Sequence, residues 1–104
     1  MSPEALREIA RNMVETVPQA SALGFKLHSI EPSRGSILTP WREDLVGDPD
    51  TGVIAGGVIT ALLDHACGLA TISMATDSKT PFSTATLDLR IDYMRAATPR
   101  ADII

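Results

Sequence analysis

The most informative part of the sequence is GGVITALLDHACGLATISMA, residues 56–75. Its apolar residues recur at almost every position around a helix instead of forming one stripe. A helix of this kind is buried on most of its sides, because no single face is left for water. We therefore predict a long central helix over residues 56–75 that other elements surround.

The same region, residues 53–76, has the length of a membrane span. Asp64 and His65 lie at its centre, however, where a charged side chain costs several kcal/mol in lipid. The N-terminal MSPEALREIARNMVE has no apolar stretch typical of a secretory signal. These features predict a cytoplasmic protein with no membrane partner.

The sequence predicts strands both before and after the central helix. GFKLHSI (residues 24–30) alternates, with Phe25 and Leu27 on one face and Ile30 on the other, and Arg34-Gly35 is a turn signal. Residues 35–41 then complete a hairpin, and residues 41–57 form a loop rich in Gly, Pro and Asp. After a second loop at 77–81, residues 82–94 alternate as a long strand, and another strand begins within residues 97–104.

The N-terminal segment predicts a short amphipathic helix. Ser2 is placed to cap it, Pro3 suits its first position, and Pro18 stops it. Its apolar positions are Leu6, Ile9, Ala10, Met13 and Val17, which follow helical spacing.

Length and charge narrow the class of protein. A chain of 104 residues forms one domain, 1–104, and a net charge of −4 disfavours nucleic acid as the partner. Three strands are too few to wrap a helix that is apolar all round. The chain therefore either pairs with a second copy or continues beyond Ile104. We expect both, so that the domain is C-terminally incomplete.

Two features of the central helix can carry chemistry. Gly56-Gly57 at its start leave N–H groups that suit a carbonyl oxygen gaining negative charge, although glycines there also permit tight packing. Asp64, in the middle of an apolar helix, needs a partner because an unpaired buried carboxylate is costly. From the residues alone, a catalytic and a structural Asp64 are equally plausible.

The runs GVIAGGVITALLDHACGLA (residues 52–70) and TATLDLRIDYMRAA (residues 84–97) together resemble the hotdog-fold thioesterases of the phenylacetic-acid-degradation (PaaI-like) type. The resemblance runs from about Leu23 to the end of the chain. It implies an α+β hotdog fold, in which an antiparallel sheet wraps the long central helix. It also implies hydrolysis of acyl-CoA thioesters by dimers or tetramers.

The resemblance assigns roles to particular residues. The Gly56 N–H would hold the thioester carbonyl with Gly57 beside it, Asp64 would act as general base or nucleophile, and Thr86 would orient the water. The family commonly has His where this chain has Ala55, and often Asn where it has Asp48-Pro49-Asp50. The loss of that imidazole predicts weakened or altered activity.

Helix geometry adds an inference of its own. Gly56 and Asp64 are eight residues apart, about 12 Å along one helix axis, so a single carbonyl cannot contact both in one subunit. If both act, they belong to different helices. We therefore expect a homodimer, or a tetramer built from dimers, with an active site between subunits.

The remaining polar residues of interest have simpler interpretations. His65 is expected to be structural at the dimer seam, and Cys67 to pack in the core. Arg90 and Arg95, with Arg100, would contact CoA phosphates or remain solvated charges. No residue cluster suggests a metal or redox cofactor.

Three other functions compete with thioester hydrolysis. The strongest is a non-catalytic module that binds acyl thioesters and lost turnover along with the histidine at position 55. A hotdog dehydratase needs a well-placed His base, which neither His28 nor His65 supplies convincingly. A dimeric scaffold would use Asp64 only in a structural pair.

Overall fold

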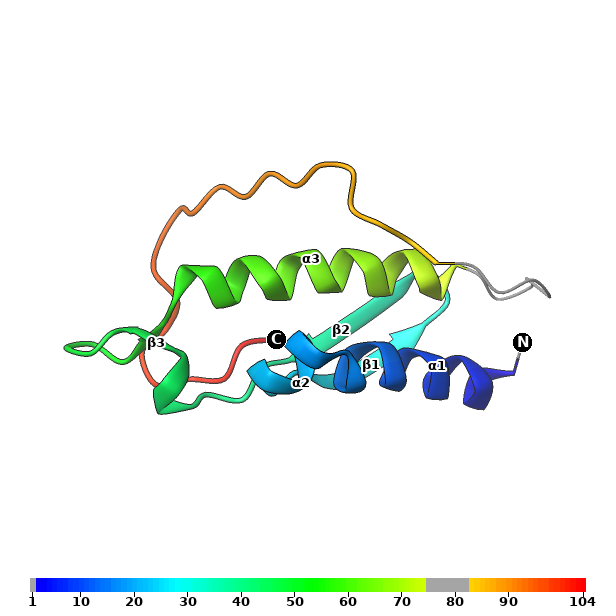
Figure 1. The fold of residues 1–104 in the computed structure, drawn as a ribbon, viewed down its shortest axis with the longest axis horizontal. Helices are drawn as coiled ribbons and strands as arrows, with labels where there is room; N and C mark the ends of the chain where they lie inside the picture. Colours follow the sequence, from blue (N-terminus) through cyan, green and yellow to red (C-terminus); the bar gives the residue numbers. More distant parts are fainter. Residues whose placement is uncertain (1, 75–82) are drawn as a thin grey trace.

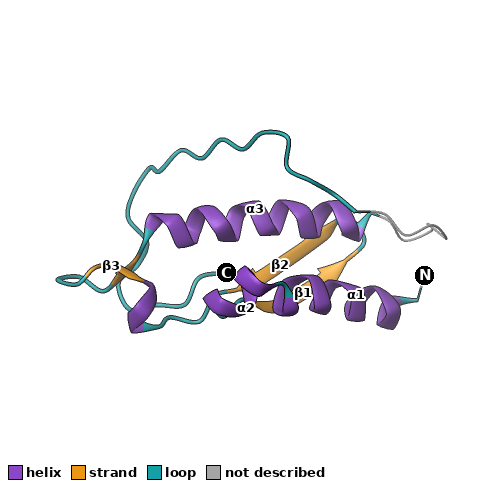
Figure 2. Cartoon of the chain, in the orientation of Figure 1, coloured by secondary structure: helices purple, strands orange, loops and turns teal. Residues whose placement is uncertain are grey.

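The computed structural model describes residues 2–74 and 83–104 (Figure 1). Its elements are, in chain order, α1 (Pro3–Thr16), α2 (Pro18–Leu23), β1 (Lys26–Glu31), β2 (Arg34–Leu38), the 3-10 turn η1 (Glu43–Leu45), β3 (Val46–Asp48), β4 (Val53–Ile54) and α3 (Gly56–Ser73). The hairpin β1–β2 contacts α1 through β1 and α3 through β2, and the two helices contact each other (Figure 2). This arrangement confirms the predicted α+β class, with a long helix on an antiparallel sheet.

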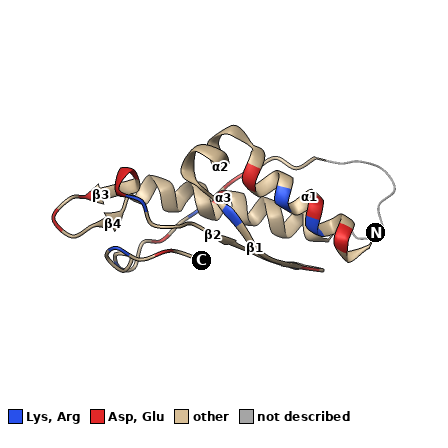
Figure 3. Ribbon diagram, turned by 90° about the horizontal axis from the view of Figure 1, so that it is seen from below, with Lys and Arg blue, Asp and Glu red and all other residues tan. Residues whose placement is uncertain are grey.

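Helix α1 begins as the sequence predicts. The Ser2 hydroxyl accepts a hydrogen bond from the Ala5 N–H at 3.1 Å, and Pro3 occupies the first turn. The buried side chains are Leu6, Ala10 and Val14, whereas Ile9 and Val17 are 43% and 42% exposed. The buried stripe of α1 therefore includes Val14 and excludes Ile9 and Val17, which the sequence had predicted to be part of it. Its residues are four positions apart, so their side chains lie in one line facing β1. Acidic and basic residues alternate along α1 (Figure 3).

Pro18 has a different role from the one predicted. Instead of ending the helical region, it starts the short helix α2 at a position where proline costs no hydrogen bond. Gly24 ends α2 with φ of 78°, a left-handed conformation that favours glycine. The chain then enters β1 with Phe25 buried in the core.

The predicted hairpin is confirmed, with two local differences. The turn lies at Pro32-Ser33, and Arg34 already pairs with Glu31. An irregularity between Leu27 and Ser29 interrupts the alternation, so Ile30 faces the core instead of the opposite side. A strict period of two cannot anticipate an inserted residue.

The segment predicted as a loop, residues 41–57, contains η1 and the small hairpin β3–β4. Arg42 organises its start, donating to the Ala22 carbonyl and pairing with Asp44 at 2.9 Å. The hydrogen bond from Arg42 holds the pKa of Asp44 below its usual value. The Ala55 N–H bonds the Leu45 carbonyl at 2.8 Å, which fixes where α3 begins.

Helix α3 lies very close to the sheet. A Cβ added to Gly35 of β2 would meet Leu69 Cδ2 at 2.7 Å, so only glycine permits this approach. Leu62, Leu69 and Ser73 are buried along this contact, but Leu63 is 40% exposed. Within the described residues, β2, α1 and residues 83–94 cover α3 only in part, so it is not buried on most sides as predicted. Helix α3 has the length and apolarity of a membrane span, and its Leu62 and Leu69 belong to the hydrophobic core cluster.

The predicted strand over residues 82–94 is wrong within the described residues, 83–94. This segment arches over α3 in Figure 1 and joins no ladder. Alternating sequence favours an extended chain, but a strand also needs a neighbouring edge, and this segment lies over helical side chains instead. Leu87 and Met94 are consequently 101% and 92% exposed. Phe82 and the predicted loop at 77–81 lie outside the described residues.

The C-terminal segment returns to the sheet. Thr39 and Ile103 form an antiparallel bridge, with hydrogen bonds of 2.7 and 3.0 Å between their backbones. Where the sequence predicts that a strand begins, within residues 97–104, the structure has one isolated β-bridge, next to the end of β2.

We expect Leu69→Ala to lower the free energy of unfolding by about 2–5 kcal/mol, because it opens a cavity between α3 and β2. Urea denaturation measures this change. The matched truncation Leu87→Ala removes a fully exposed side chain, and its effect should stay within about 0.5 kcal/mol. Equal losses in the two variants would contradict this description of the core.

Candidate active site

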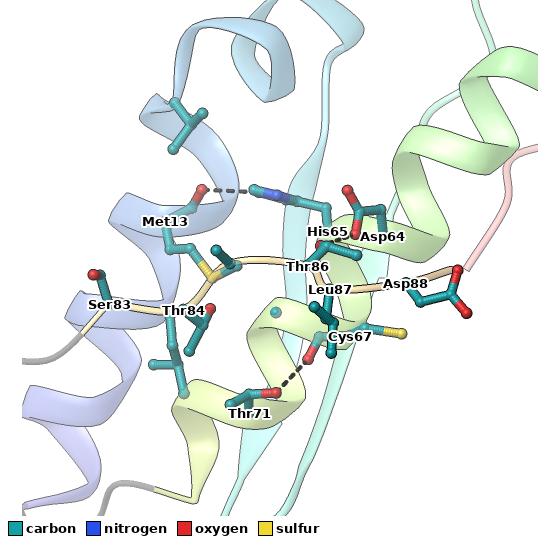
Figure 4. A pocket seen from close by; sticks show the side chains of 14 residues that line it. Met13, Asp64, His65, Cys67, Thr71, Ser83, Thr84, Thr86, Leu87 and Asp88 are labelled. Atoms are coloured by element: carbon teal, nitrogen blue, oxygen red, sulfur yellow. Dashed lines mark hydrogen bonds between the residues drawn. The ribbon is translucent and has the colours of Figure 1, made fainter. Parts of the chain in front are cut away.

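The central feature of the site is a hydrogen bond between two residues 22 positions apart. The Thr86 hydroxyl donates to Asp64 Oδ1 at 2.5 Å. Both side chains line a cleft of about 660 Å³ between α1, α3 and residues 83–88 (Figure 4). The structure thus brings together two of the three residues expected to be catalytic.

Helix geometry explains why Asp64 faces this cleft. Leu62 and Leu69 point toward β2, and Asp64 lies about 200° around the helix from Leu62. Burial of the two leucines therefore directs the carboxylate away from the sheet. Asp64 is half-buried, and the Thr86 hydroxyl partly replaces the water that it loses.

His65 has a structural contact within its own chain. Its Nε2 lies 2.9 Å from the Met13 carbonyl oxygen, and because a carbonyl only accepts, Nε2 carries the proton. The ring also lies 5.9 Å from that of Phe25. In Figure 4 His65 points to α1, away from the carboxylate of Asp64. Within the described chain this contact joins α3 to α1, and the place of His65 at a dimer seam stays a prediction.

Cys67 is not a core residue, contrary to the prediction. It is exposed and lines the cleft one helical turn after Asp64. The error has a simple cause, since a helix that is apolar all round gives no signal of which side meets the sheet.

At the start of α3, Gly56 and Gly57 are exposed, and Ala55 supplies no side-chain cap. A Cβ added to Gly57 would meet no described atom within 4 Å beyond its own helix and neighbours. Tight packing within the described chain therefore does not explain this glycine. Since no side chain caps this helix start, its N–H groups remain available as donors to a ligand atom.

Two residues near Gly56 were not identified from the sequence. The Tyr93 hydroxyl lies 2.8 Å, and the Thr60 hydroxyl 3.0 Å, from the Gly56 carbonyl oxygen. Thr60 could have been found, because residues four apart adjoin on a helix. The contact of Tyr93 could not be found from the sequence, because in a regular strand Tyr93 would point to the opposite side from Thr86. A bend at Leu87 lets both reach α3.

The arginines lie on the same extended segment. Arg95 lines a hollow of about 390 Å³ that also includes Gly56 and Tyr93. Arg90 is exposed and pairs with Asp92 at 3.3 Å. Arg100 bonds the Thr51 carbonyl at 3.2 Å, so it fastens the β3–β4 hairpin. Arg95 alone among the three borders the start of α3.

Asp64 and Gly56 face separate hollows of this chain. The cleft that contains Asp64 and Thr86 does not include Gly56, and the hollow at Gly56 does not include Asp64. The described chain thus presents a carboxylate with a hydroxyl partner at one place and an uncapped pair of amides at another.

A long helix that starts with Gly-Gly, packs on an antiparallel sheet and carries a cleft-facing aspartate is the arrangement that the resemblance to the hotdog class predicts. Residues 51–104, just over half of the chain, match the model of the thioesterase superfamily. The chain belongs to that superfamily, as the resemblance in its sequence indicated.

Curated relatives carry the name medium/long-chain acyl-CoA thioesterase YigI, in Salmonella typhimurium and in Escherichia coli strain K12. Each is 28% identical over 102 residues, which cover 88% of this chain. The chain spans 66% of the length of these relatives.

Solved structures agree on the fold. A protein from Pseudomonas aeruginosa superposes with a TM-score of 0.77 at 33% identity, covering 93% of this chain and 70% of its own. A second structure, of a protein from the thioesterase superfamily, gives a TM-score of 0.77 at 28% identity. It covers 94% of this chain and 70% of its own.

The exposure of Cys67 can be measured directly. We expect a thiol reagent such as DTNB to modify one thiol per chain in the native protein, because Cys67 is free and exposed. Absorbance of the released thionitrobenzoate reports the stoichiometry, and Cys67→Ser should give none. Modification that requires denaturant would mean that Cys67 is buried.

Proposed function

We propose that this protein hydrolyses acyl-CoA thioesters, in the manner of the PaaI-like branch of its superfamily. The observation that carries the proposal is the hydrogen bond from Thr86 to Asp64, in a cleft of a thioesterase-superfamily chain. The name of the curated relatives supports a substrate with a medium or long acyl chain.

In the proposed mechanism Asp64 is the general base. The Thr86 hydroxyl donates its only proton to Asp64 Oδ1, so its lone pairs are free to accept a hydrogen bond from water. The second Asp64 oxygen takes a proton from that water as its oxygen attacks the thioester carbon. The tetrahedral intermediate then collapses, the carbon–sulfur bond breaks, and the proton on Asp64 passes to the departing thiolate. The products are the free acid and CoA.

The carbonyl oxygen needs donors while it is negatively charged. We assign this role to the N–H groups at the start of α3, where the positive end of the helix dipole adds to the effect. Gly56 and Asp64 are about 12 Å apart along one axis and border separate hollows, which supports a site built from two subunits. In this arrangement Gly56 of one subunit faces Asp64 of the other, within a dimer or a tetramer of dimers.

The CoA moiety carries phosphates that require positive charge. Arg95 borders the hollow at Gly56, so we assign it to phosphate binding. Arg90 is already paired with Asp92, which makes it the weaker candidate of the two.

One observation favours a second function, that of a non-catalytic acyl-thioester binder. Ala55 stands at the start of α3 and contributes no polar contact where the family commonly has His. Chromatographic detection of CoA released from a panel of acyl-CoAs separates the two functions. Release supports the enzyme, and tight binding without release supports the binder.

Variants of the hydrogen-bonded pair test the mechanism. Asp64→Asn should lower kcat by about 10²–10⁴-fold without unfolding the protein, because the near-isosteric amide is no base. Thr86→Ala should lower kcat about ten- to hundredfold, and Thr86→Ser, which keeps the hydroxyl, is the matched control and should be nearly silent. Unchanged turnover in Asp64→Asn would remove Asp64 from the mechanism. A serine variant as poor as alanine would make Thr86 a packing residue.

Subunit mixing tests the shared site. Asp64→Ala and Gly56→Pro should each be inactive, since proline deletes the Gly56 N–H at a helix position that tolerates it. After exchange, about half of the dimers are mixed, and each has one doubly altered site and one intact site. About a quarter of wild-type activity should return. Circular dichroism and tagged-subunit exchange serve as controls, and no recovery with both satisfied contradicts a shared site.

A further inference from the structure

A second group of hydroxyls lies on α3, away from Asp64. The Tyr93 hydroxyl is 2.8 Å from the Gly56 carbonyl oxygen and 2.5 Å from Thr60 Oγ1. Thr60 Oγ1 is itself 3.0 Å from the same carbonyl oxygen. The three oxygens therefore form a closed triangle at the first turn of the helix.

Proton counting shows what this triangle does. Each hydroxyl has one proton, whereas the Gly56 carbonyl has none and only accepts. Two protons cannot fill three contacts, so either both hydroxyls donate to the carbonyl, or one donates to the other, which donates to the carbonyl. In every arrangement the Gly56 carbonyl accepts an O–H bond in addition to its helical N–H bond. Linked donors of this kind polarise one another.

Polarisation of the Gly56 carbonyl changes the Gly57 N–H through the peptide bond that joins them. The Gly56 carbonyl and the Gly57 N–H belong to one planar unit, so fixing the carbonyl also fixes the direction of this N–H. Electron density drawn toward the carbonyl oxygen leaves the Gly57 N–H a stronger donor. Gly57 is exposed, lies in a first turn without a side-chain cap, and has open space around it.

We propose that Tyr93 and Thr60 are positioning residues, which orient and polarise the Gly57 N–H so that it is a second donor to the thioester carbonyl oxygen beside the Gly56 N–H. This inference rests on the proposed thioesterase function. Neither side chain needs to touch the substrate, because both act through the Gly56–Gly57 peptide.

A purely structural role makes a different prediction. The Tyr93 ring lies 3.7–3.8 Å from the position of a Cβ on Gly56, so the ring alone could hold the extended segment on α3. Phenylalanine keeps this ring contact and removes only the hydroxyl. Tyr93→Phe therefore separates polarisation of the peptide from packing.

The first experiment does not depend on activity. In ¹H–¹⁵N spectra of the full-length protein, Tyr93→Phe and Thr60→Val should each move the Gly57 amide proton upfield, because its peptide loses polarisation. Thr60→Ser should restore the wild-type position. Thr16→Val is the matched control, since Thr16 makes the same bond to a carbonyl four residues back, on α1. It should leave Gly57 unmoved. An unshifted Gly57 resonance in both test variants would overturn the proposal.

The second experiment measures hydrolysis. Tyr93→Phe and Thr60→Val should each lower kcat about three- to tenfold with little change in KM, because the N–H matters most to the charged transition state. A rise in KM at constant kcat would overturn the positioning role and assign Tyr93 to substrate binding. If the wild-type protein releases no CoA, the proposed function fails, and the Gly57 resonance alone decides whether the hydroxyls polarise this peptide.

Discussion

The structure depends on the close approach of α3 to β2. Gly35 has no side chain, and the space where its Cβ would stand is occupied by Leu69. Interiors are packed densely enough that a single methyl group at this point would push the helix away from the sheet. Leu62, seven residues before Leu69, points the same way, so the contact sets the rotation of the whole helix. The direction of every functional residue on α3 follows from that rotation.

The extended segment over residues 83–94 connects the two functional parts of α3. Thr86 contacts Asp64 in the middle of the helix, and Tyr93 contacts the Gly56 carbonyl at its start. In each case a hydroxyl from this segment meets an acceptor on the helix. A regular strand would turn one of these side chains away, so the bend at Leu87 allows both contacts. Residues 83–94 thus contribute hydroxyl groups to two parts of α3, although they form no β-ladder.

The outer side of α3 and the segment above it leave large apolar side chains in solvent. Leu63 is 40% exposed and Met94 92%, and both line one hollow of the surface. Exposed apolar side chains of this size are found on faces that meet another polypeptide. This exposure agrees with the proposed site between subunits, where Asp64 of one subunit works with Gly56 of the next. Association of two subunits would also bury the remaining apolar sides of α3, as its sequence predicts.

Elements with strong local signals could be predicted from the amino-acid sequence. Ser2 and Pro3 start α1, the alternating run through Phe25 and Leu27 gives the first strand of a hairpin, and the unbroken apolar pattern gives α3. The sequence also singled out Asp64, because an acid in the middle of an apolar helix is conspicuous, and the resemblance supplied its partner Thr86.

The neighbours of these elements could not be predicted, because they depend on the packing of the whole fold. Alternation makes residues 83–94 extended, but whether they pair as a strand depends on an available edge, which is a property of the whole fold. Apolar residues all round α3 could not indicate that Cys67 faces the cleft. The contact of Tyr93 with Gly56 spans 37 residues and requires a bend, so no local pattern contains it. Local signals fix conformation over a few residues, whereas contacts between distant segments are fixed by packing.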